Sequence, residues 1–333
     1  MKELIMQLSS LSRSEDVIEF ISRTAEKYGK VRKIGDNIAV EIGMTEAKRH
    51  IMLDAHYDEI GFIVTGIDGN GFLQVASCGG IDRRTLLGHE VVVHGKSDLR
   101  GIICCQPPHL TSSSDYKKAP KISEIAIDIG LSAKEAKNNV SVGDYVHLYS
   151  GEACELLGGR ITGKALDNRA GVAALLKTAE LLENKILPDT KVTLLFSAQE
   201  ELGKRGAVTG AYEIAPDEAI FVDASFNTTP GCNPNECGKM SEGPMIGISP
   251  ILSKEMAGRL KNLADKYQLE IMPEETGTDS DVISVTRGGI PTAMLSIPLS
   301  YMHTGIEIID SADVEMTAKL MADYILSGGE LRA

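Results

Sequence analysis

The chain has 333 residues, of which 43% are hydrophobic, so it can form one large domain or two domains with a core each. Its 47 acidic residues outnumber its 34 basic residues and give a formal net charge of −13, which argues against binding to nucleic acid or to an anionic membrane surface. No apolar stretch approaches the roughly 20 residues that are needed to span a bilayer.

The N-terminus and the cysteines both indicate the cellular compartment of the protein. The first residues lack the basic, apolar and small-residue regions of a secretion signal. Of the six scattered cysteines, only Cys232 and Cys237 come near the spacing of metal ligands, and no second Cys or His pair lies beside them. Free thiols in a reducing compartment explain this distribution, because disulfides are rare in the cytosol. We therefore expect a cytoplasmic protein.

The N-terminal region combines a helix with two strands. Apolar residues recur at helical spacing over 17–28, and Gly29 follows at the expected stop. Two β-type runs come next, at 37–42 and 49–55, and the second is apolar almost throughout, as a strand buried on both faces would be. His56 therefore stands where this strand leaves the core.

The pattern changes between about residue 66 and residue 159. Glycines there punctuate short β-type runs such as Glu90–His94, which favours a small β-rich barrel or sandwich. The stretch 107–120 has the composition of a loop. We predict that residues 66–159 form a domain inserted into an α/β domain, which consists of residues 1–65 and 160–333.

After Gly163, helical and strand patterns alternate up to the C-terminus, which is typical of a sheet covered by helices. Apolar runs at 191–196, 219–222 and 291–297 predict buried strands, and amphipathic segments between and after them predict helices. The predicted fold is therefore α/β, with a mixed central sheet flanked by helices and an inserted smaller β-rich, barrel-like domain.

Residues that can bind metal or move protons follow two of these strands. His56 and Asp58 follow the run at 49–55, and their spacing places both side chains on the same side of an extended chain. Glu200 and Glu201 follow the run at 191–196, and adjacent carboxylates need full solvation or a cation between them. A surface histidine and a solvated acidic turn would also explain each pair taken separately.

Three further polar residues stand at comparable places. Asp223 and His303 each follow an apolar strand-like run, and Asp167 precedes a long amphipathic segment, where a role as helix N-cap would also account for it.

Two divalent ions about 3.5–4 Å apart need a bridging carboxylate and about two further N or O ligands each. That number is supplied by His56, Asp167, Glu201, Asp223 and His303. Glu200 is left to take a proton from water and pass it to a leaving amine.

Several ordered blocks resemble one known family. They are 54–62, 164–169, 199–207, 277–280, 289–292 and 301–304. Together they are similar to the dinuclear-metal aminopeptidases of metallopeptidase family 42, which include tetrahedral, glutamyl and deblocking aminopeptidases and some members once labelled endoglucanases. The resemblance runs from about residue 50 to the end of the chain.

The resemblance implies a role for each candidate residue and a cofactor. It implies two divalent metal ions per chain, with zinc or cobalt as the usual metal and manganese as a further candidate. In the implied arrangement one ion is held by His56 and Asp223 and the other by Glu201 and His303, with Asp167 bridging, Glu200 as general base and Asp58 behind His56.

The resemblance also implies a substrate class and an assembly. Members remove N-terminal residues from short peptides, and they commonly form dimers that assemble into tetrahedral dodecamers through the inserted domain. Asn168 is compatible with the family pattern, whereas Lys204 and Ser300 depart from it near the site, so the preferred N-terminal residue stays open.

Two other functions remain open at this point. A glycoside hydrolase of the endoglucanase type also uses paired carboxylates, which face each other across a sugar at roughly 5–10 Å, but it gives no reason for His56 and His303. A non-catalytic assembly subunit would keep the fold and lose a ligand or the base, and the chain retains all of them.

Overall fold

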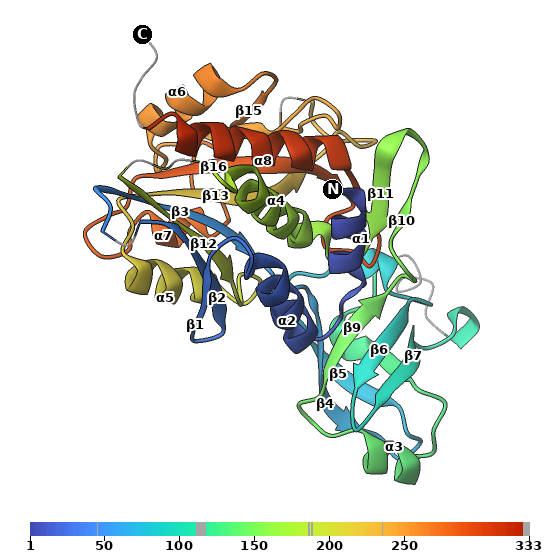
Figure 1. The fold of residues 1–333 in the computed structure, drawn as a ribbon. Helices are drawn as coiled ribbons and strands as arrows, with labels where there is room; N and C mark the ends of the chain where they lie inside the picture. The colour runs from blue at the N-terminus through green and yellow to red at the C-terminus, as the bar shows by residue number, and fades with distance from the viewer. Residues whose placement is uncertain (45, 111–117, 186, 188, 235, 329–333) are drawn as a thin grey trace. The chain divides into compact units, whose positions relative to one another are not determined.

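The computed structural model describes residues 1–44, 46–110, 118–185, 187, 189–234 and 236–328 (Figure 1). It divides into two compact units. The first consists of residues 1–58, 152–302 and 307 onward, and the second of residues 59–151 and 303–306. The domain boundaries at 66 and 159 stay a prediction. Part of the predicted 107–120 loop, residues 111–117, lies outside the described residues.

One mixed sheet organises the first unit. Its strands are β1 (Lys30–Ile34), β2 (Asn37–Gly43), β3 (Arg49–His56), β10 (Cys154–Glu155), β11 (Arg160–Gly163), β12 (Thr190–Ser197), β13 (Glu218–Phe226), β14 (Met245–Ile248), β15 (Gln268–Ile271), β16 (Thr292–Ser300) and β17 (Glu307–Asp310). The main order is β1, β2, β12, β3, β13, β16, β17, β11, β10, while β14 pairs with both β15 and β16. Strands β12, β3, β13 and β16 run parallel, so their carboxyl ends meet at one edge.

Helices cover both faces of this sheet. They are α1 (Lys2–Ser10), α2 (Ser14–Ala25), α4 (Leu166–Leu182), α5 (Arg205–Ile214), α6 (Lys254–Leu263), α7 (Ser280–Ile283) and α8 (Ser311–Leu326), with a short 3-10 helix at Leu157–Gly159. Ile220 and Val222 of β13 join the core formed with α4 and α8, whereas Ala219 joins the core formed with α5 and α7 (Figure 1). Neighbouring residues of a strand point to opposite faces, so this strand is buried on both.

The sequence of the central strands explains their position. Residues 51–56 of β3 are all buried, and residues 192–197 of β12 are all buried too. Parallel strands covered on both faces need such nearly continuous apolar runs, because neither face meets water. The predicted fold class, a mixed sheet flanked by helices together with a β-rich barrel, is confirmed.

The second unit is built on a closed barrel. In barrel order its strands are β4 (Gly61–Ile67), β5 (Leu73–Cys78), β8 (Ala126–Asp128), β7 (Asp98–Cys104), β6 (Glu90–His94) and β9 (Tyr145–Tyr149). Helix α3 (Ala133–Asn139) and 3-10 helices at Arg83–Thr85, Pro108–Leu110 and Ile122–Glu124 complete it. Phe62, Val91 and Ile127 lie in its core, and closure leaves these strands no free edge.

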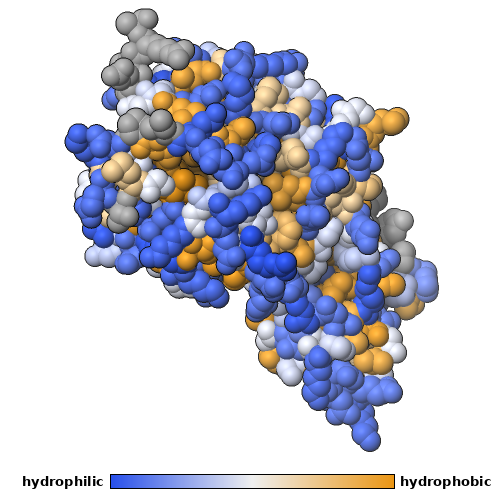
Figure 2. Space-filling model, viewed as in Figure 1, coloured by the Kyte–Doolittle hydropathy of each residue, from blue (hydrophilic) through white to orange (hydrophobic). Residues whose placement is uncertain are grey.

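Hydrophilic residues predominate on the face drawn in Figure 2, with hydrophobic residues scattered among them. Among the described residues, we find no helix that combines the length and the apolar character needed to cross a membrane.

The central strand provides a stability test. Leu53 is fully buried in β3, so Leu53→Ala should lower the free energy of unfolding by about 2–5 kcal/mol, because it removes apolar contacts and leaves a cavity. The measurement is the urea unfolding midpoint. Leu269→Ala is the matched control, since Leu269 of β15 is 48% exposed and its change should stay within about 1 kcal/mol. Equal effects of the two variants would contradict the packing described for β3.

Candidate metal-binding site

His56 and Asp223 lie at the same level on neighbouring strands. The register pairs Phe221 of β13 with Asp54 of β3, so Asp223 and His56, each two residues further on, lie level with each other and point to the same face. His56 is 1% exposed, and its Nε2 atom lies 3.6 Å from Asp223 Oδ1. The same nitrogen lies 3.3 Å from Asp167 Oδ1.

The backbone at the start of α4 presents Asp167 to this group. Asp167 and Asn168 have non-helical backbone angles, and the Asp167 N–H donates to Glu307 Oε2 at 3.0 Å. The Asn168 side chain accepts from the N–H of Gly171 at 3.0 Å and donates to the Val222 carbonyl at 2.7 Å. Asn168 therefore does the capping that the sequence allowed for Asp167, and the Asp167 carboxylate can face His56.

The donor set fits a divalent cation. His56, Asp167 and Asp223 each offer one ligand atom, and these atoms lie within 4.8 Å of one another. Asp167 and Glu201 also offer atoms within 4.8 Å of each other. Burial raises the pKa of Asp223, which the hydrogen bond with His56 opposes and the Asp167 carboxylate reinforces. Buried carboxylates that face each other repel unless a cation lies between them, and imidazole with carboxylate is a usual donor set for zinc.

Asp58 connects the histidine to the two glutamates. Its Oδ1 atom lies 3.5 Å from His56 Nδ1 and accepts from the N–H of Glu200 at 3.1 Å. Its Oδ2 atom accepts from the N–H of Glu201 at 3.3 Å. One carboxylate therefore fixes the turn that carries both glutamates, a role that the sequence did not predict.

Glu200 is an unusually basic carboxylate in this structure. Burial raises its pKa to about 8, which the nearby His56 opposes and the carboxylates of Asp223, Glu201 and Asp167 reinforce. A carboxylate in such surroundings holds a proton more readily than one in water, which suits a group that must accept and release protons.

Two buried acids beneath the site were missed by the sequence analysis. Asp54 and Asp279 are fully buried, and Ser197 Oγ donates to Asp279 Oδ2 at 2.9 Å. Burial raises the pKa of both carboxyl groups, and for Asp279 the neighbouring Asp54 adds to the rise. The available signal was an aspartate inside the apolar run 49–55, where a charge is costly.

His303 belongs to the second unit, in the segment 303–306. It has a left-handed backbone conformation, with φ of 60°, and its carbonyl accepts from the N–H of Asp82 at 3.0 Å. It directly follows Met302 of the first unit. The first unit itself brings together six of the seven candidates: His56, Asp58, Asp167, Glu200, Glu201 and Asp223.

The two residues that depart from the family pattern are both engaged in contacts. Lys204 Nζ lies 2.7 Å from Asp281 Oδ2, and both side chains are largely buried. Ser300 Oγ accepts from Asn227 Nδ2 at 2.8 Å.

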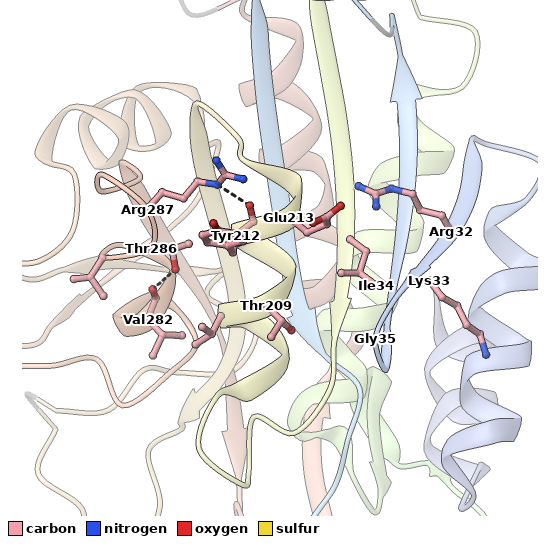
Figure 3. Close-up of a pocket in the computed structure, with 12 residues that line it drawn as sticks. Arg32, Lys33, Ile34, Gly35, Thr209, Tyr212, Glu213, Val282, Thr286 and Arg287 are labelled. Carbon is pink, nitrogen blue, oxygen red and sulfur yellow. Dashed lines mark hydrogen bonds between the residues drawn. The ribbon is translucent and has the colours of Figure 1, made fainter.

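A surface cavity of about 740 Å³ lies elsewhere on the first unit. Its lining includes Ile34, Val208, Tyr212 and Thr286, and Arg287 donates to the Tyr212 carbonyl at its rim (Figure 3). None of the seven candidate residues lines it. The candidate site is therefore identified by the chemistry of its side chains and not by the volume of this cavity.

Comparison with known proteins finds relatives over most of the chain. The family model for M42 glutamyl aminopeptidase matches residues 35–320. The lysyl aminopeptidase of Pyrococcus furiosus is 29% identical over 315 residues, which cover 91% of this chain and 88% of the relative. A solved aminopeptidase from the archaeon Desulfurococcus kamchatkensis has a TM-score of 0.89 and 31% identity, covering 99% of this chain and 98% of its own. The TET1 peptidase of Pyrococcus horikoshii, which can assemble into a tetrahedron or a large octahedral shell, has a TM-score of 0.84 and 30% identity, covering 96% and 98%.

Metal binding should depend on Asp167. In Asp167→Asn the carboxylate charge that faces His56 is lost, so the affinity for zinc should fall at least about tenfold. Calorimetric titration of metal-free protein with zinc measures this affinity. Asp265→Asn is the matched control, because the Asp265 side chain is 79% exposed. Equal zinc affinity in wild type and Asp167→Asn would show that the metal binds elsewhere.

Proposed function

Because the chain belongs to the M42 glutamyl aminopeptidase family, we propose that it is a metal-dependent aminopeptidase that removes N-terminal residues from short peptides. The observation that carries the proposal is the buried cluster of His56, Asp167 and Asp223 beside the Glu200–Glu201 turn. The cluster lies at the carboxyl ends of parallel strands, where open α/β sheets commonly bind their ligands.

We further propose a pair of divalent ions, zinc or cobalt with manganese as a further candidate. His56 and Asp223 would hold one ion, and Glu201 and His303 would hold the other. Asp167 would bridge them, and its nearness to both His56 and Glu201 supports this assignment. When bound, such ions polarise the scissile carbonyl and make water more acidic.

The protein side chains would divide the remaining work. Asp58 faces His56 Nδ1, so it can fix the tautomer whose Nε2 atom points at the ligand cluster. Glu200 would take a proton from the attacking water and give it to the nitrogen of the leaving amine. Its backbone is held by Asp58, so the base and the histidine are positioned by the same carboxylate.

This mechanism gives a role to each of the candidate residues, whereas the two alternative functions do not. A glycoside hydrolase would leave the buried His56, between two carboxylates, without a role. A non-catalytic assembly subunit would give no reason for a buried group of like charges around Glu200.

We also propose a homo-oligomer in which dimers assemble into a tetrahedral dodecamer, with the barrel making contacts. The likeness to the TET1 peptidase of Pyrococcus horikoshii supports this proposal. A cytoplasmic location is supported by the cysteines, since all six are free.

The general base provides the decisive kinetic test. Glu200→Gln keeps the shape of the side chain and removes its basicity, so kcat on aminoacyl p-nitroanilides should fall about 10²–10⁴-fold. Wild type and variant are assayed with zinc, cobalt and manganese in turn. Glu242→Gln is the matched control, because this carboxylate pairs with Lys266 at an exposed site.

Two results would refute the proposed function. In the first, wild-type protein releases no residue from any substrate with any of the three metals. In the second, Glu200→Gln is as active as wild type while Glu242→Gln behaves in the same way.

A further inference from the structure

We propose that Glu270 binds the side chain of the substrate's first residue and selects peptides that begin with a cationic residue, lysine or arginine. The inference rests on the proposed aminopeptidase function, because it assigns a pocket within that active site. It concerns only which N-terminal residue the enzyme prefers.

Glu270 lies on the sheet next to the candidate metal-binding residues His56, Asp167 and Asp223. Its carboxylate accepts hydrogen bonds from the hydroxyl groups of Ser225 in β13 and Ser296 in β16. Ser296 pairs directly with Asp223 in the sheet register, and Ser225 follows Asp223 by two residues, so all three side chains point to one face. The Glu270 carboxylate therefore lies beside Asp223 and further along β13, within roughly 5–7 Å of the Asp223 position.

That face is the one on which a substrate would sit. His56 points to the same face as Asp223, because the two residues are level on neighbouring strands that run parallel. A peptide whose terminal amine and first carbonyl lie at the His56–Asp223 cluster has its first side chain within reach of the neighbouring strand. Lysine and arginine carry their charge on a long flexible stem, which suits this distance.

The charge of Glu270 lacks a counter-ion in the described part of the chain. Its hydrogen-bond partners are the two serine hydroxyls, which donate without neutralising the carboxylate. Burial raises the pKa of Glu270, and no nearby cation opposes the rise. Glu270 is partly buried, and a carboxylate withdrawn from water is costly unless a cation pairs with it. An ammonium or guanidinium group from the substrate would supply that cation.

The same arrangement disfavours acidic first residues. A glutamate side chain beside Glu270 would bring two negative charges together, which costs affinity. Lys204, the cation next to the Glu200–Glu201 turn, is already paired with Asp281 and thus does not provide an open site for an acidic group.

The test compares p-nitroanilides of lysine, norleucine and glutamate on zinc-loaded protein. Norleucine has the lysine stem without its ammonium group, so the lysine-to-norleucine ratio of kcat/KM isolates the charge. We expect a ratio of at least about tenfold in wild type, and a fall of the ratio to about one in Glu270→Gln, because the amide cannot pair with the ammonium. Glu275→Gln, at an exposed position five residues further on, should keep the wild-type ratio.

The outcomes separate this inference from the proposed function. A wild-type ratio near one, a preference for glutamate over norleucine, or an unchanged ratio in Glu270→Gln overturns the role of Glu270 while the aminopeptidase activity stands. Wild-type protein that cleaves none of the substrates refutes the proposed function and this inference with it. If Glu270→Gln does not fold, a wild-type ratio near one still overturns the proposal.

Discussion

Repulsion between buried carboxylates is the constraint on which the site depends. Asp167 and Asp223 both lie within 4 Å of one His56 nitrogen, with Glu201 beside Asp167. Like charges at this spacing in a buried place cost free energy, which the rest of the fold and a bound cation must offset. Metal binding is therefore expected to stabilise the folded state as well as to enable the chemistry. The ligand cluster exists only in the folded chain, so the ion binds the folded state more tightly than the unfolded state.

The surrounding structure holds these charges in place with few groups. The parallel register sets His56 and Asp223 level with each other. Asn168 caps the helix and leaves Asp167 turned toward the histidine, while Asp58 accepts from the two N–H groups of the glutamate turn. The pairing of β13 with β3 and the contacts of Asp58 join residues from different strands or loops, so the geometry of the site depends on the sheet as a whole.

The sequence predicted the parts that depend on local pattern. Long apolar runs predicted the central strands. Polar residues at their ends, together with Asp167 before a helical segment, predicted six side chains that the first unit brings together. Helix α1 was missed because nine residues give little periodicity. The contact of the Asn168 side chain with the Val222 carbonyl, the double role of Asp58 and the contact of Glu270 with two serines could not be predicted, because each joins positions that only the folded chain brings together. For Asp167 the local pattern allowed a cap as readily as a ligand, and in the structure Asn168 takes the capping role.

The central claim is that this repulsive cluster is a two-ion site shared through Asp167. Anomalous diffraction at the zinc absorption edge, from crystals of the zinc-loaded protein, tests it most directly. The account predicts two peaks about 3.5–4 Å apart, one beside His56 and Asp223 and the other beside Glu201, with the Asp167 carboxylate between them. Zinc peaks away from these side chains, or fully loaded protein with no peak beside His56, would contradict it.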